Sequence, residues 1–285
     1  ILYRLVGSEM CIRDSVDQTK TVSFDFDGKS YHGFEGDTLA SALLSNGVHL
    51  VGRSFKYHRP RGIMSSGSEE PNAICQINED TNLTEPNVRA TEIELYEGLK
   101  ASSQNCWPSV NFDIGGINNF ISPFIPAGFY YKTFMWPKSF WKKIYEPLIR
   151  WSAGLGKSPT KPDPELYDHK HVHCDVLIIG GGISGIIASK IAAKNNLKTI
   201  LIEDKNILGG STIFQKNENY KINDKYSGEW IYEEIAELKK LDNLTIKTRT
   251  SLAAYHSYNY LLAKENISDH LPLDKKNGGI RQRLW

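Results

Sequence analysis

The residues best suited to chemistry are three glycines, Gly180, Gly182 and Gly185, and the carboxylate of Glu203. The apolar run CDVLIIG lies directly before the glycines, and a helix-forming segment follows them. In this setting the first glycine makes a tight turn, the second lets a pyrophosphate reach the backbone, and the third brings helix against strand. Backbone N–H groups at the helix start then face the phosphates. The pattern indicates a dinucleotide site; a glycine turn without a nucleotide is the alternative.

Glu203 ends the next expected strand, 23 residues after Gly180. A carboxylate there can bind both ribose hydroxyls and disfavours a 2′-phosphate, so NAD or FAD is favoured over NADP. The segment EDKNILGGS that follows resembles an element of glutathione-reductase-like flavoproteins, in which the second glycine pair lies close to the nucleotide. That scaffold binds either FAD or NAD, and these residues do not separate the two. The predicted cofactor-binding residues are Gly180, Gly181, Gly182, Ser184, Gly185, Glu203, Asp204, Gly209, Gly210 and Ser211.

A second stretch, RGIMSSGSEEPNAIC, has the frame of a plant-type [2Fe–2S] loop without its cysteines. Thiolates at that spacing converge on two irons. The three slots hold Ser65, Glu70 and Ala73. Cys75 lies beside them and is expected to be a buried strand residue.

The elements around this loop follow the order of a β-grasp domain. Residues 20–34 alternate apolar and polar residues around an Asp27-Gly28 turn, which predicts a hairpin. A helix is expected next, with Asp37 as its N-cap and Gly47 at its end. Strands at 72–78 and 89–97 would complete the domain. Residues 16–104 are therefore predicted to form a ferredoxin-like α+β domain without an iron–sulfur cluster.

Residues 105–172 are rich in Trp, Tyr, Phe and Pro and are predicted to be a linker. Within them, residues 137–156 indicate a short amphipathic helix with Trp141, Tyr145 and Leu148 on one side. We expect it to pack against another domain or subunit; a helix at a membrane surface is the alternative.

Residues 173–285 read as strand, glycine turn, helix and strand, typical of an α/β Rossmann-like FAD/NAD(P)-binding domain. Further on, Ser227 is expected to cap a helix, and 243–255 and 256–267 to form strands. These strands are too few for the full domain, so the domain is predicted to be incomplete and the fragment to bind NAD weakly.

Bulk properties narrow the class. The chain has 285 residues, 40% of them hydrophobic, and a net charge of +1, which gives no argument for nucleic acid or an anionic membrane. Four scattered cysteines suit a reducing cytoplasm, and no apolar run has the length of a membrane span. His169, His171 and His173 alternate without a partner cluster, so no metal site is predicted. The first fifteen residues resemble a translated sequencing adapter and are excluded.

Several segments together resemble the α subunits of heterotetrameric sarcosine oxidases. They include GDTLASALLSNGVHLVGRSFKYHRPRGI, SQNCWPS, SPFIPAGFYYKTFMWP and CDVLIIGGGISG, and they span most of residues 20–215. At the fourth cluster position, where related domains have R-A-C, this chain has Thr91. All four ligand positions then lack cysteine, as in this family.

The resemblance implies a flavoenzyme that oxidises sarcosine with O₂ to glycine and hydrogen peroxide and forms 5,10-methylenetetrahydrofolate. It implies FAD in the β subunit, a covalently bound FMN, γ and δ subunits, and NAD in the fold present here. It assigns no catalytic residue to this chain. A folate-binding domain would lie beyond residue 285, and the fragment alone is expected to be inactive.

Three alternatives stay open. The chain could belong to a related opine, secondary-amine or cyanide-forming dehydrogenase. It could be a non-catalytic scaffold that binds a dinucleotide for structure alone. It could be an electron-transfer module, which would require a cluster. The basic loop FKYHRPRG, with Lys56, His58, Arg59 and Arg61, could bind an anion or form an ion-paired surface loop.

Overall fold

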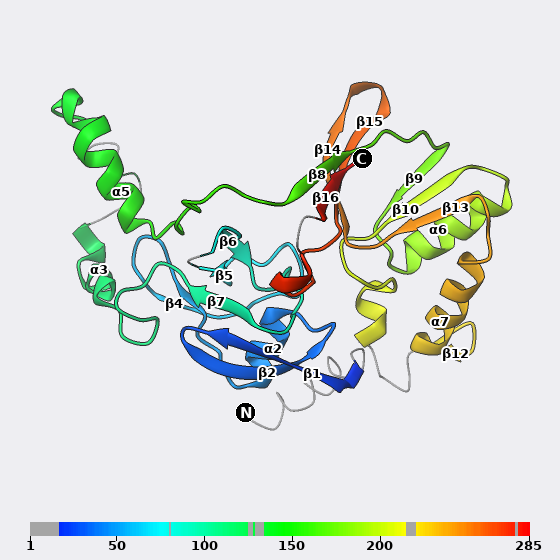
Figure 1. The fold of residues 1–285 in the computed structure, drawn as a ribbon, viewed down its shortest axis with the longest axis horizontal. Helices are drawn as coiled ribbons and strands as arrows, with labels where there is room; N and C mark the ends of the chain where they lie inside the picture. The colour runs from blue at the N-terminus through cyan, green and yellow to red at the C-terminus, as the bar shows by residue number, and fades with distance from the viewer. Residues whose placement is uncertain (1–16, 80, 125–127, 129–133, 215–220, 277–278) are drawn as a thin grey trace. The chain divides into compact units, whose positions relative to one another are not determined.

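The chain divides into two compact units, one of Thr19–Asp163 and one that contains Pro164–Trp285. The computed structural model describes residues 17–79, 81–124, 128, 134–214, 221–276 and 279–285 (Figure 1). The first fifteen residues, interpreted above as an artefact, lie outside this described part.

The first unit contains a five-stranded sheet in the order β2-β1-β7-β5-β6. β1 and β7 are parallel, and β5 is antiparallel to both β7 and β6. The predicted hairpin is confirmed: Asp27 and Gly28 have φ of 51° and 74° in the turn between β1 and β2. The sheet strands are β1 Asp17–Phe26, β2 Lys29–Glu35, β5 Ile74–Ile77, β6 Glu85–Arg89 and β7 Leu99–Ser103, and a separate small ribbon pairs β3 Gly52–Arg53 with β4 Pro60–Arg61.

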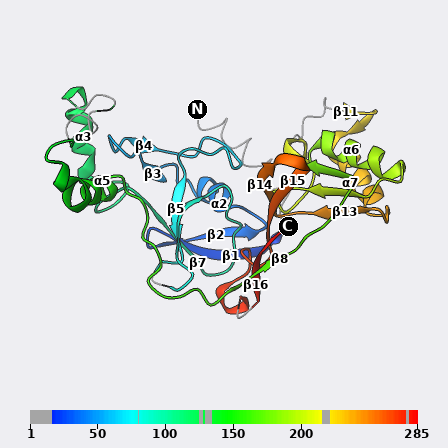
Figure 2. The same ribbon diagram turned by 90° about the horizontal axis from the view of Figure 1, so that it is seen from above.

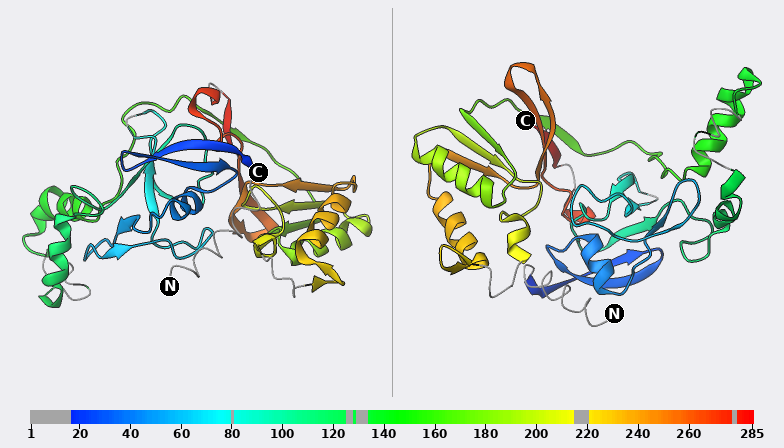
Figure 3. Two further views of the ribbon diagram at one scale, coloured as in Figure 1. Left: turned by 90° about the horizontal axis from the view of Figure 1, so that it is seen from below. Right: turned by 180° about the vertical axis from the view of Figure 1, so that it is seen from behind.

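The predicted helix of this unit is α2, Leu39–Ser45, which lies against the sheet (Figure 3). The expected N-cap, Asp37, was wrong by one residue. Thr38 is the N-cap, because its Oγ1 accepts the Ser41 N–H at 3.2 Å, whereas the Asp37 carboxylate accepts the Ser41 hydroxyl at 2.7 Å. Two side chains thus share the start of the helix.

The strand expected at 89–97 is not formed. Backbone groups there bond to the start of α2 and the residues before it instead: the Leu39 N–H donates to the Ile93 carbonyl at 2.8 Å and the Leu95 N–H to the Asp37 carbonyl at 2.8 Å. The apolar residues of this segment are buried because they belong to the same core as α2. Their alternation with polar residues therefore does not indicate a strand. The strands lie on either side of it, as β6 and β7.

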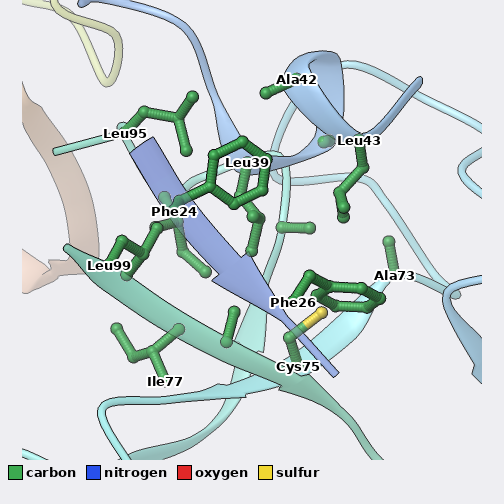
Figure 4. Close-up of a cluster of buried hydrophobic side chains, with 14 of the residues drawn as sticks. Phe24, Phe26, Leu39, Ala42, Leu43, Ala73, Cys75, Ile77, Leu95 and Leu99 are labelled. Atoms are coloured by element: carbon green, nitrogen blue, oxygen red, sulfur yellow. The ribbon is translucent and has the colours of Figure 1, made fainter. Parts of the chain in front are cut away.

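The core of this unit lies between α2 and the sheet (Figure 4). Phe24, Leu39, Leu43 and Leu99 are at most 1% exposed. Cys75 is fully buried among them, as expected for a strand residue. This packing holds the loop between β4 and β5, where a cluster would lie in a ferredoxin.

Residues 105–163, predicted as a linker, belong to the first unit. Asn105 Nδ2 donates to the Ser54 carbonyl at 2.7 Å, and the Lys157 N–H donates to Gln76 Oε1 at 2.8 Å. The helix expected near 137–156 is present in three pieces: a 3₁₀ turn Lys138–Phe140, a π-helical turn Trp141–Tyr145 and α5 Glu146–Ser152. A further helix, α3, covers Ile117–Phe120.

The second unit is built on parallel strands in the order β13-β10-β9. Helices α6 and α7 pack together on one face, where Ile186, Leu201 and Ile231 are buried (Figure 2). The elements are β9 Val176–Ile179, α6 Ile183–Lys194, β10 Thr199–Ile202, α7 Ser227–Leu238 and β13 Leu244–Lys247.

A mixed sheet covers the other face, in the order β14-β15-β16-β8; β15 is antiparallel to β14 and β16, β8 is parallel to β16, and Ala263 is buried against Ile200 and Ile202. Residues 243–255, expected to form one strand, form two, because β13 and β14 lie in different sheets. Leu166–His169, assigned above to the linker, contributes the edge strand β8. The elements of this sheet are β8 Leu166–His169, β14 Thr250–His256, β15 Tyr260–Asn266 and β16 Ile280–Leu284.

A two-stranded ribbon, β11 Lys221–Ile222 and β12 Lys225–Tyr226, leads directly into α7. Because the chain enters the helix from β12, the extended residue before it is Tyr226, which is the N-cap. Ser227, expected to be the cap, is instead the first helical residue and is buried. In the described part of the chain, no helix combines the length and apolarity required to cross a bilayer.

Leu43→Ala should destabilise the first unit by about 2–5 kcal/mol, because Leu43 is fully buried and truncation leaves a cavity. The matched control is Leu155→Ala in the same unit, where Leu155 is 52% exposed and the change should stay within about 0.5 kcal/mol. Urea unfolding followed by circular dichroism measures both. Equal losses in the two variants would contradict the assigned core.

Candidate dinucleotide site

The glycine turn connects β9 to α6 at the carboxyl edge of the parallel sheet. Gly180 has φ of 96°, and its N–H donates to the Ile202 carbonyl at 2.8 Å. Gly182 is the N-cap of α6, so the backbone N–H groups of the first helical turn follow it directly. Sheet edge and helix start therefore meet at one turn, which is the arrangement that binds a pyrophosphate.

The glycines of the turn differ in how much space surrounds them, and the differences match what a bound nucleotide requires. A Cβ on Gly185 would lie 1.9 Å from the Gly180 carbonyl oxygen, so a side chain there would separate the helix from the strand. A Cβ on Gly181 would lie 2.4 Å from Leu208. A Cβ on Gly182 meets no atom within 4 Å. Gly180 is also open but has φ of 96°, so it makes the turn, whereas Gly182 leaves space for a phosphate at the start of α6; these residues fit a dinucleotide.

Glu203 ties the turn to the end of β10. Its Oε2 accepts the Gly181 N–H at 2.5 Å and its Oε1 accepts the Lys205 N–H at 2.9 Å. The residue is 6% exposed. Burial, followed by a hydrogen bond with Asp204, raises the pKa of Glu203 to about 6. The carboxylate is thus held beside the glycine turn, where a ribose would lie.

The second glycine pair also lies at this turn. The Gly209 N–H donates to the Gly181 carbonyl at 2.7 Å, and a Cβ on Gly210 would lie 3.2 Å from the Gly182 Cα. Ser184, Asp204 and Ser211 are exposed. The structure thus brings the two glycine pairs and Glu203 together and leaves these three side chains facing solvent.

The sequence did not predict that the connection from β13 to β14 lies at the carboxyl edge of the parallel sheet. The Glu203 N–H donates to the Lys247 carbonyl at 2.9 Å, and the Thr250 N–H donates to the Glu203 carbonyl at 2.8 Å. The connection from β13 to β14 therefore fixes the backbone of Glu203. Its signal was hidden because residues 243–255 look like one continuous strand.

The loop with the ferredoxin frame has an unsuitable donor set. Ser65, Glu70, Ala73 and Thr91 stand at the four ligand positions and supply no thiolate. Burial raises the pKa of nearby Cys75 to about 12, so it is a neutral thiol at physiological pH. Four thiolates are what a [2Fe–2S] centre of this type requires, so these residues do not fit the cluster.

The remaining candidates from the sequence were metal ligands and the basic loop FKYHRPRG. In that part of the chain no three His, Cys, Asp or Glu side chains are grouped to hold a metal. In the basic loop, His58 Nδ1 lies 2.7 Å from Asp113 Oδ2, and Arg59 Nε donates to Asn119 Oδ1 at 2.8 Å. These two side chains bind the 105–120 segment, as in the ion-paired alternative.

Comparison with known families matches both units. Residues 19–106 match the model of the 2Fe-2S iron-sulfur cluster binding domain, and residues 175–273 match that of the FAD dependent oxidoreductases. Among solved structures, L-proline dehydrogenase from P. horikoshii shares the fold, with a TM-score of 0.51 and 20% identity over 94% of this chain and 40% of that one. The units define a ferredoxin-like domain joined to a domain of the FAD-dependent oxidoreductase class.

Two curated relatives extend over almost the whole chain. Sarcosine oxidase subunit alpha of Rhizobium meliloti (strain 1021) is 45% identical over 273 residues, which are 96% of this chain and 27% of the relative. Its counterpart in Corynebacterium sp. (strain P-1) is 28% identical over 99% of this chain and 24% of the relative. The chain is a homologue of sarcosine oxidase α subunits and spans about a quarter of their length.

Glu203 should make stability depend on pH. Its pKa of about 6 in the folded state exceeds the ordinary value of 4.5, so the folded state binds the proton more tightly. The contribution of Glu203 to stability is then greatest below pH 4.5 and is lost, by of order 1–2 kcal/mol, as pH rises through about 6. Glu203→Gln should remove this component of the pH dependence.

The measurement is urea unfolding of both proteins at intervals from pH 4 to 7. The difference between wild type and Glu203→Gln isolates Glu203 from the other titrating groups. A difference that does not change with pH would show that Glu203 titrates normally.

Proposed function

We propose that this chain is part of the α subunit of a multisubunit flavoenzyme that oxidises sarcosine. The reaction uses O₂ and yields glycine and hydrogen peroxide, while the one-carbon unit passes to tetrahydrofolate as 5,10-methylenetetrahydrofolate. The observation that carries the proposal is the 45% identity to a sarcosine oxidase α subunit over 96% of this chain. The open position at Gly182 and the buried Glu203 support a retained dinucleotide site.

In this proposal the second unit binds the dinucleotide. The N–H groups at the start of α6 face the pyrophosphate, and Glu203 accepts hydrogen bonds from the ribose hydroxyls. A dinucleotide bound there supplies redox chemistry or, as NAD, a structural anchor. We propose NAD from the family resemblance, whereas the match to FAD-dependent oxidoreductases supports FAD. FMN, a second flavin and folate would bind elsewhere in the intact complex.

The partners in this proposal are β, γ and δ subunits. Among the described residues between 107 and 155, the large apolar side chains that support such a contact are 43–83% exposed, and exposed apolar side chains that gather on a surface mark protein contacts. They are Trp107, Phe112, Ile114, Ile117, Phe120, Ile121, Met135, Trp136, Phe140, Trp141, Ile144, Leu148, Trp151 and Leu155. The cytoplasmic location expected from the scattered cysteines is part of the same proposal.

Gly182→Ala should block the dinucleotide without unfolding the protein. The new methyl group meets no protein atom within 4 Å. Replacing glycine by alanine at this N-cap should therefore lower the free energy of unfolding by about 1 kcal/mol or less. The same methyl group would occupy the space of the pyrophosphate. We expect affinity for the preferred dinucleotide to fall at least about tenfold, or about 1.4 kcal/mol.

Isothermal titration with NAD and with FAD measures this effect. The matched control is Gly228→Ala in α7, where a Cβ also meets no atom within 4 Å. Wild-type binding of NAD should be micromolar or weaker. Sub-micromolar NAD affinity would contradict the weak binding expected of this chain, and equal affinities of wild type and Gly182→Ala would show that the glycine turn is not part of the site.

Expression of the complete locus, read through both ends of this frame, tests the activity itself. We expect the frame to continue into a folate-binding domain, the β, γ and δ subunits to copurify, and sarcosine to yield hydrogen peroxide. Copurification of a cysteine-rich small subunit, with turnover of an opine and none of sarcosine, would contradict the proposal.

A further inference from the structure

In the loop between β4 and β5, hydrogen bonds connect the positions at which a ferredoxin has its cluster cysteines. Thr91, at the fourth ligand position, donates its hydroxyl to the Gly67 carbonyl at 2.8 Å. Glu70, at the second, donates its N–H to the same carbonyl at 3.1 Å. All four positions thus remain around one short loop.

The side chain of Glu70 accounts for this order. Its Oε2 accepts the N–H groups of Met64 and Ser65, each at 2.7 Å, and the Ser65 hydroxyl at 3.3 Å. Its Oε1 accepts the N–H groups of Asn72 and Ala73, at 2.7 and 3.2 Å. One carboxylate therefore receives backbone donors from both ends of the loop.

This carboxylate is 1% exposed and is ionised. Burial alone would raise its pKa, but the N–H groups of Ser65, Asn72, Met64 and Ala73 together hold the pKa of Glu70 below the ordinary 4.5. Converging N–H groups form an anion site, and in iron–sulfur domains such groups donate to the sulfurs. Here the anion belongs to the protein.

We infer that the loop is an internal anion site in which the Glu70 carboxylate takes the place of the iron–sulfur cluster. Glu70 is a positioning residue: it satisfies four backbone donors that would otherwise be buried without acceptors. The domain therefore folds without metal, and its loop keeps the conformation of a cluster-binding ancestor. This inference concerns the first unit alone and does not depend on the proposed activity.

Glu70→Gln tests the role of the charge. The amide retains the size of the side chain, but its NH₂ group faces one pair of backbone N–H donors. Hydrogen exchange by mass spectrometry on the full chain should show peptides of residues 63–73 exchanging at least about tenfold faster than in wild type. The matched control, Glu35→Gln, removes an exposed carboxylate of the same unit outside this loop, which pairs with Lys20, and should leave exchange of residues 63–73 unchanged.

Glu70→Ala tests whether the site is truly an anion site. Sodium formate should raise the melting temperature of this variant more than sodium chloride of equal ionic strength, and should have no such effect on wild type. Equal exchange in Glu70→Gln and wild type, or absence of a formate effect on a folded Glu70→Ala, would overturn the inference. Visible iron–sulfur absorbance after wild type is treated with iron and sulfide would also overturn it.

Discussion

Backbone N–H groups that leave regular secondary structure need acceptors, and in both units a buried carboxylate provides them. Glu203 accepts the N–H groups of Gly181 and Lys205, and so joins the glycine turn to the end of β10. Glu70 accepts four N–H groups and joins the two ends of the loop before β5. Both loops have the form of sites for anionic cofactors, and in each a buried carboxyl group accepts the backbone N–H groups that shape the loop.

The two sites differ in what is left open. Beside Glu203, the Gly182 position faces free space at the start of α6, so a phosphate can still approach. Beside Ser65, the carboxylate of Glu70 occupies the loop and is buried. The same principle therefore favours ligand binding in the second unit and excludes it from the first.

The layers of the molecule hold these loops in place. α2 and the five-stranded sheet bury Phe24, Leu39 and Leu43, and the chain from 89 to 97 is pinned beneath the helix by backbone bonds. In the second unit, helices on one face and a mixed sheet on the other hold the carboxyl edge of β10 in place. Large apolar side chains such as Phe120, Trp136 and Trp151 are exposed, and they are the observation on which the proposed subunit contact rests.

The sequence alone determined the glycine turn, the acidic residue after the second strand, the β-hairpin and the missing cysteines. These features depend on residue type at fixed local spacing, such as Gly180 to Gly185 or the left-handed turn at Asp27 and Gly28. Only the tertiary structure decided that residues 89–97 are not a strand, because their backbone partners come from Asp37 and Leu39, far away in the sequence. It likewise decided the role of Glu70, since its four donors lie within six residues along the chain but the residue types do not show that the loop turns their N–H groups toward its carboxylate.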